Sequence, residues 1–145
     1  MRPAPDVLVV DAAILVSALV GRSAGALFDA AKSVRLATTD RAMVETSRRV
    51  ALGLNRSDLL PALDALVADL DVVAVEALGP LTGAATVLRE AVASRNGSTD
   101  DAHILALAWE LDADIWSHDR DFAGTGVATW STVNLLRALT IAEQV

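Results

Sequence analysis

The side chains of this sequence that could perform chemistry are mainly carboxylates. The chain has 19 Asp and Glu residues and no Cys, so a thiol nucleophile and a Cys-ligated zinc site are excluded. Its two histidines, His103 and His118, do not have the spacing of a zinc site. The acids that could act are therefore spread along the sequence: Asp11, Glu45, the adjacent pair Asp100 and Asp101, and Asp119.

The elements predicted around these acids alternate between strands and helices. Strands are predicted over Val7 to Val10, Val34 to Thr38, Asp71 to Val75, Asp114 to Ser117 and Val127 to Trp130, the first and third with the apolar pattern of buried strands. Helices are predicted over Ala12 to Val20, Ala24 to Ser33, Thr39 or Asp40 to about Leu54, a segment capped by Ser57, Thr82 to Arg95, Ser98 to Glu110 and Thr132 to Ala142. This alternation predicts an α/β fold with a parallel sheet covered on both faces. With 145 residues, 53% of them hydrophobic, we expect one domain over residues 1–145.

Asp11 and Asp119 are expected at the same edge of this sheet. Asp11 directly follows the strand Val7 to Val10, and Asp119 follows the strand Asp114 to Ser117 after one intervening residue. Ligands of open parallel sheets bind beyond the carboxyl ends of the strands, where both acids would lie. Capping of a helix or turn is an equally good interpretation of either acid taken alone.

Of the adjacent acids Asp100 and Asp101, only one can face the sheet, because neighbouring helical residues point about 100° apart. Either acid suits the start of a helix, and Ser98 with Asp101 resembles a capping box. Asp101, however, shares its helical stripe with the apolar residues Ile104 and Leu105. We therefore predict that Asp101 points inward over the edge of the sheet.

Glu45 lies opposite the apolar stripe of its predicted helix. Its helical neighbours include three arginines, Arg41, Arg48 and Arg49, which suit a solvated face of ion pairs. Helical periodicity alone therefore favours a structural role for Glu45.

A divalent cation would explain why several carboxylates converge. Neighbouring carboxylates repel one another and raise each other's pKa unless a cation lies among them. Mg²⁺ binds one or two carboxylates, keeps several waters and leaves positions for phosphate oxygens, which suits phosphodiester cleavage. The net charge of −7 excludes a groove that holds nucleic acid by counterion release alone, and 3% aromatic residues argue against base stacking. Arginines such as Arg41, Arg48 and Arg120 would have to guide phosphates locally.

Four blocks of sequence, in this order, resemble the PIN-domain nucleases. They are Val7-Leu-Val-Val-Asp11, Thr38-Thr39 before the helix that carries Glu45, Asp101-Ala-His-Ile-Leu-Ala-Leu-Ala108, and Ile115-Trp-Ser-His-Asp119-Arg-Asp121-Phe122. The resemblance implies a three-layer α/β fold with a central parallel sheet, and a Mg²⁺ or Mn²⁺ site that cleaves RNA. By position, it implies that Asp11, Glu45, Asp101 and Asp119 are catalytic and that Asp11, Asp101 and Asp119 bind the metal. Asp121 would be an outer member of the site, and the number of metal ions stays open.

The sequence departs from the family pattern at two places. Many members have Thr and then Ser or Asn after the first acid, where this chain has Ala12 and Ala13, so hydrogen bonds that orient Asp11 would be missing. Ser117 stands where Thr usually precedes the last acid by two residues, and it keeps the hydroxyl group. A haloacid-dehalogenase-type phosphatase and a phospho-receiver domain are both disfavoured, because each needs a Lys late in the chain and the one Lys is Lys32.

The residues and the resemblance together favour an endoribonuclease that is the toxin of a VapBC-type toxin–antitoxin pair. Its partners would be RNA, an antitoxin protein and, as is usual in the family, a second copy of itself. Two alternatives stay open: a stand-alone PIN nuclease without an antitoxin, and a catalytically weak binding or regulatory module with the same fold. We expect a cytoplasmic protein without a membrane span, because Cys is absent and Asp11 interrupts the apolar stretch from Val7 to Val20.

Overall fold

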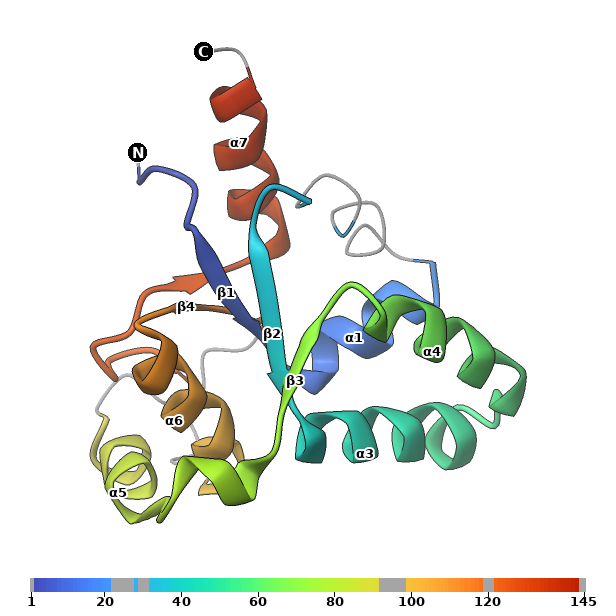
Figure 1. The fold of residues 1–145 in the computed structure, drawn as a ribbon, viewed down its shortest axis with the longest axis horizontal. Coiled ribbons are helices and arrows are strands. Elements are labelled where there is room, and N and C mark those ends of the chain that lie inside the picture. The colour runs from blue at the N-terminus through green and yellow to red at the C-terminus, as the bar shows by residue number, and fades with distance from the viewer. Residues whose placement is uncertain (1, 22–27, 29–31, 92–98, 119–121, 144–145) are drawn as a thin grey trace.

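The computed structural model describes residues 2–21, 28, 32–91, 99–118 and 122–143. Its centre is a sheet of five parallel strands in the order β3-β2-β1-β4-β5 (Figure 1). The strands are β1 (Val7–Val10), β2 (Arg35–Thr39), β3 (Asp71–Val73), β4 (Asp114–Trp116) and β5 (Thr129–Trp130). Because all pairs are parallel, the carboxyl ends of the strands lie at one edge, below β1 and β2 in Figure 1.

Helices connect the strands and cover both faces of the sheet. They are α1 (Ala12–Leu19), α3 (Asp40–Arg48), α4 (Leu60–Val67), α5 (Thr82–Glu90), α6 (Ala102–Leu111) and α7 (Thr132–Glu143). Short helical turns are η1 (Arg49–Gly53), η2 (Ser57–Leu59), η3 (Val75–Leu78) and η4 (Thr99–Asp101), of which η1 is a π-helical turn. In Figure 1, α5 and α6 lie to one side of the sheet and α1 and α4 to the other. The predicted three-layer α/β fold is thus confirmed.

The core consists of two apolar clusters, one on each face of the sheet. Successive side chains of a strand point to opposite faces, so β1 contributes to both clusters. Leu8 and Val10 pack with Ile14 and other residues of α1 and α7. Val9 packs on the other face with α6 residues such as Leu105. All of these side chains are fully buried, which explains why β1 has an uninterrupted apolar sequence.

β3 differs from its prediction because it is an edge strand. The run Asp71 to Val75 predicts a buried strand, but β3 ends at Val73, and both Asp71 and Val72 are exposed. The strand pairs with β2 on one side, and the Asp71 carboxylate accepts a hydrogen bond of 2.6 Å from Nε of Arg35 on β2. An apolar run therefore identified the strand here but not its position in the sheet.

The structure also corrects the ends of several predicted helices. The helix predicted to reach Leu54 is α-helical only to Arg48 and continues as the π-helical turn η1. Ser57 opens the turn η2 without capping it, and α4 follows with Pro61 in its first turn, where Pro is tolerated. Most of the predicted helix over residues 24–33, residues 92–95 and the predicted cap Ser98 lie outside the described residues. Within the described ranges, no helix is both long and apolar enough to span a membrane.

Candidate functional site

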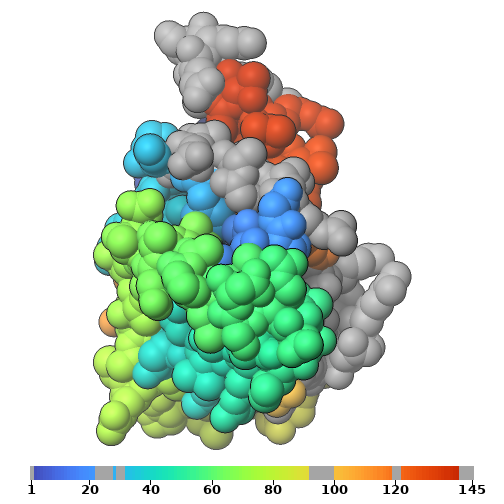
Figure 2. Space-filling model, turned by 90° about the vertical axis from the view of Figure 1, so that its right-hand side faces the viewer, coloured from blue at the N-terminus to red at the C-terminus, as the bar shows by residue number. Residues whose placement is uncertain are grey.

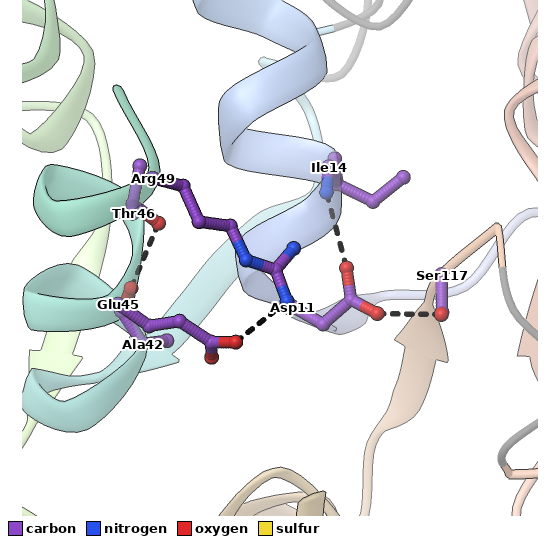
Figure 3. Close-up of polar contacts among 7 residues, drawn as sticks. All are labelled: Asp11, Ile14, Ala42, Glu45, Thr46, Arg49 and Ser117. Carbon is purple, nitrogen blue, oxygen red and sulfur yellow. Dashed lines mark hydrogen bonds and ion pairs between the residues drawn. The ribbon is translucent and has the colours of Figure 1, made fainter. Parts of the chain in front are cut away.

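Asp11 is the first residue after β1, and two hydrogen bonds fix its carboxylate (Figure 3). Its Oδ1 accepts a bond of 3.1 Å from the backbone N of Ile14, which makes Asp11 the N-cap of α1. Its Oδ2 accepts a bond of 2.5 Å from Oγ of Ser117, and the residue is only 7% exposed. Asp11 therefore is a helix cap and also lies at the carboxyl edge of the sheet. Each carboxylate oxygen has a second lone pair, so a carboxylate that caps a helix can also bind a cation.

Ser117 reaches Asp11 because their strands are neighbours. Val10 and Trp116 are paired in the parallel register of β1 and β4, and Asp11 and Ser117 are the next residue on each strand. Ser117 is 2% exposed, so its hydroxyl is held in place. Ala12 and Ala13 have no side-chain donor that could orient Asp11, but the hydroxyl of Ser117 on the neighbouring strand does orient it. The sequence shows that Ser117 has a hydroxyl group, but that this group bonds to Asp11 follows only from the pairing of β1 with β4.

Glu45 is half-buried on α3 and is paired with an arginine. Its Oε1 accepts a bond of 2.7 Å from Arg49, with the two side chains 41% and 51% exposed. An ion pair at this exposure contributes about 0.3–0.5 kcal/mol, so the pair explains little of the stability. Figure 3 shows Glu45 of α3 and Arg49, the first residue of η1, extending on the side of α1, and α1 and α3 are in contact. The predicted ion-pair face of this helix is thus present.

A groove of about 360 Å³ separates α3 from the start of α6. It is lined by Arg41, Val44, Glu45, Arg48, Arg49, Asp100 and His103. The acid that shares this groove with Glu45 is therefore Asp100, which is exposed. Asp101 is half-buried at the position before α6 and does not line the groove. Asp101 is more buried than Asp100, as expected for a side chain that points inward. Asp100 instead lines the groove together with Glu45.

A buried polar pair joins the end of β2 to α6. Oγ1 of Thr39 lies 2.7 Å from Nδ1 of His103 and also accepts a bond of 3.0 Å from the backbone N of Ala42, which caps α3. The pKa of His103 is lowered to about 4, chiefly by burial and also by nearby Arg41, while Asp40 and Asp100 act in the opposite direction. The imidazole is therefore neutral near pH 7. The pair thus links the start of α3, which carries Glu45, to the start of α6, which directly follows the acids of η4.

His118 is exposed and follows Ser117 directly, just beyond the carboxyl end of β4. Its Nε2 is 3.4 Å from Oγ1 of Thr132, which accepts a bond of 3.1 Å from Nε1 of Trp116. The next three residues, Asp119, Arg120 and Asp121, lie outside the described residues. In the part of the chain that the structure describes, no three His, Asp or Glu side chains are grouped as a metal site would require. The available donors are carboxylate oxygens, which suit a hard divalent cation such as Mg²⁺ or Mn²⁺.

Comparison with known proteins gives a consistent family and fold. The sequence model of the PIN domain matches residues 9–140. No match was found among curated proteins. Similar solved structures are VapBC2 from Rickettsia felis bound to a DNA fragment from its promoter (15% identity, 86% of this chain, 98% of that chain, TM-score 0.65), PAE2754 from Pyrobaculum aerophilum (20%, 92%, 95%, 0.67) and a toxin–antitoxin complex from Klebsiella pneumoniae (19%, 86%, 97%, 0.62).

Identities this low establish similarity of fold, and the match of the sequence model establishes the family. The matched region contains Asp11, Glu45, Asp101 and the end of β4, so it spans every element that positions the candidate site. The fold expected from the sequence and the family that it resembles are therefore the ones found. The chain belongs to the PIN-domain family.

Proposed function

We propose that residues 1–145 form a single PIN nuclease domain that cleaves RNA with a divalent metal ion, as the toxin of a toxin–antitoxin pair. The observation that carries the proposal is the carboxylate of Asp11. It is buried, oriented by Ser117 and Ile14, and lies at the carboxyl edge of the sheet. A carboxylate held in this way at a ligand-binding edge is suited to coordinate a cation.

In this proposal, Asp11, Asp101 and Asp119 hold Mg²⁺ or Mn²⁺ through their oxygens. When bound, the ion would polarise a phosphate oxygen and lower the pKa of a bound water. The protein orients the side chains that would bind the ion: the Ser117 hydroxyl holds the Asp11 side chain in one rotamer through its bond to Oδ2. Glu45 would accept a proton from the attacking water or orient it, because its carboxylate lies in the groove next to this edge.

The proposed partners are RNA, an antitoxin protein and a second copy of the chain, in the cytoplasm. The similar structures from R. felis and K. pneumoniae are toxin–antitoxin complexes, and this chain covers nearly the whole length of both. Their fold similarity supports an antitoxin partner here. A PIN nuclease without an antitoxin would have the same site, so the antitoxin must be tested by co-purification with the product of a neighbouring gene.

The decisive experiment incubates the purified protein with structured and unstructured RNA in Mg²⁺, in Mn²⁺ and in EDTA. We expect cleavage with either metal and none in EDTA. Asp101→Asn should abolish cleavage, while its matched control Asp100→Asn should retain most of it. Activity that survives Asp101→Asn but not Asp100→Asn would exchange the roles of the two acids, and RNA binding without cleavage would favour a binding module.

A further inference from the structure

The exposed face of α3 borders two grooves that meet. The first is the groove next to Glu45, and the second, of about 570 Å³, is lined by Asp40, Arg41, Val44, Val75, Glu76, Gly79 and Leu81. Arg41 and Val44 line both grooves, so a ligand that occupies one can continue into the other across these two side chains. Figure 2 shows α3, in cyan, at the lower edge of this side of the molecule, below α4 in green.

The first groove is locally basic although the chain is acidic. Arg41 and Arg48 are two helical turns apart on one face of α3, or about 10 Å along its axis. Neither makes an ion pair with a described residue, whereas Arg49 is paired with Glu45. The groove thus has three guanidinium groups against two carboxylates, in a chain of net charge −7. Guanidinium groups bind phosphate oxygens through paired hydrogen bonds, so anionic groups of a ligand are favoured here.

The second groove favours an uncharged group. Its apolar lining consists of Val44, which is 51% exposed, together with Val75 and Leu81. Oδ1 of Asp40 accepts a bond of 2.9 Å from the backbone N of Val75, which fixes η3 against α3. The carboxylates of Asp40 and Glu76 would repel a phosphate. A flat, apolar group such as a nucleobase is compatible with this lining.

We propose that the face of α3 binds single-stranded RNA, with backbone phosphates on Arg41 and Arg48 and one unpaired base in the groove between α3 and η3. The proposal rests on the proposed function for the identity of its ligand, RNA. The base must be unpaired, because bases inside a duplex are stacked and cannot enter a side groove. Glu45 lines the same groove as the two arginines, so a strand bound to them would pass this predicted catalytic residue.

The test measures binding of a fluorescent 12-nucleotide single-stranded RNA by anisotropy in EDTA, where metal-dependent cleavage cannot occur. Arg41→Gln and Arg48→Gln should each raise the Kd about tenfold and reduce the slope of log K against log salt by about 0.7. Arg35→Gln is the matched control: it removes the same charge from the start of β2, at the opposite edge of the sheet. Val44→Ser should raise the Kd about threefold without changing the salt slope, because it removes apolar contact and no charge.

Three results would overturn the inference: no binding of RNA by the wild-type protein, unchanged Kd values in both arginine variants, or equally tight binding of a duplex of the same sequence. The nuclease proposal is tested separately by cleavage in Mg²⁺. Wild-type cleavage with unaffected arginine variants would refute this RNA-binding face and leave the nuclease. Arginine-dependent binding without cleavage would support the RNA-binding face and refute the nuclease proposal.

Discussion

Acidification should destabilise this protein through one buried imidazole, that of His103. In the folded state its pKa is lowered to about 4 by burial and by Arg41, against an ordinary value of 6.5 in the unfolded chain. Between these two values the unfolded state binds more protons than the folded state. The stability contributed by the neutral imidazole is therefore complete above the unfolded pKa and is lost as the pH falls from 6.5 toward 4.

The magnitude follows from the two pKa values. Proton linkage gives a loss of about 2 kcal/mol between pH 7 and pH 5 from this residue, and at most about 3 kcal/mol when the titration is complete. For a domain of this length, about 2 kcal/mol corresponds to a decrease in melting temperature of roughly 6 °C. A protonated Nδ1 can only donate in its contact with Oγ1 of Thr39, so the titrating ring touches the hydroxyl that caps α3.

The assay compares thermal melts of the wild type and of His103→Gln at pH 7, 6 and 5 in EDTA. Gln can still bond to Thr39 but does not titrate, so the wild type should lose about 6 °C more than the variant between pH 7 and pH 5. Carboxylates titrate in both proteins and cancel in this difference. The exposed His118→Gln is the control and should behave as the wild type. Equal pH dependence in the wild type and His103→Gln, or an NMR titration of the His103 ring near 6.5, would refute the reasoning.

Three further predictions concern the acidic edge. Ser117→Ala should lower Mg²⁺ affinity about tenfold in calorimetric titrations, because Asp11 loses its orienting bond; unchanged affinity would make Ser117 merely structural. Asp11→Asn should keep its melting temperature in EDTA, since Asn also caps helices, but lose the rise of roughly 3–6 °C that 10 mM Mg²⁺ gives for an assumed Kd of about 1 mM. A strong loss of stability in EDTA with a normal Mg²⁺ response would show that Asp11 is only a cap. Glu45→Gln should change the melting temperature by less than about 2 °C while slowing RNA cleavage; wild-type rates at saturating metal would leave Glu45 with its ion pair alone.

Local sequence patterns were sufficient to predict the layers of the fold. The apolar run of β1 and the alternation of strands with helices predict a parallel sheet with both faces covered, because each pattern reflects burial that every such fold requires. Patterns could not predict where an element lies in the sheet, as β3 shows. They also missed the change from α-helix to π-helix at Arg49, which depends on backbone hydrogen bonds and not on side-chain type.

For the candidate site, the sequence indicated the acids but not their neighbours. Asp11 follows directly from its place after a buried strand. The Ser117 hydroxyl on Asp11 and the Thr39 hydroxyl near His103 join residues 106 and 64 positions apart, and such contacts arise only when strands pair and helices pack. His103 lies on α6, and its burial depends on the packing of α6 against β2, which no local pattern predicts. The roles of Glu45, Asp101 and Asp119 stay predictions until activity is measured.

The edge strand β3 has a consequence for the behaviour of the protein at high concentration. An unprotected strand edge offers backbone groups to a strand of another molecule and so promotes aggregation. Here the edge is three residues long and begins with Asp71, whose charge is held at the surface by Arg35. A strand from a neighbouring molecule would have to bury that ion pair in order to extend the sheet. The exposed ion pair of β3 thus disfavours extension of the sheet by a strand of another molecule at this edge.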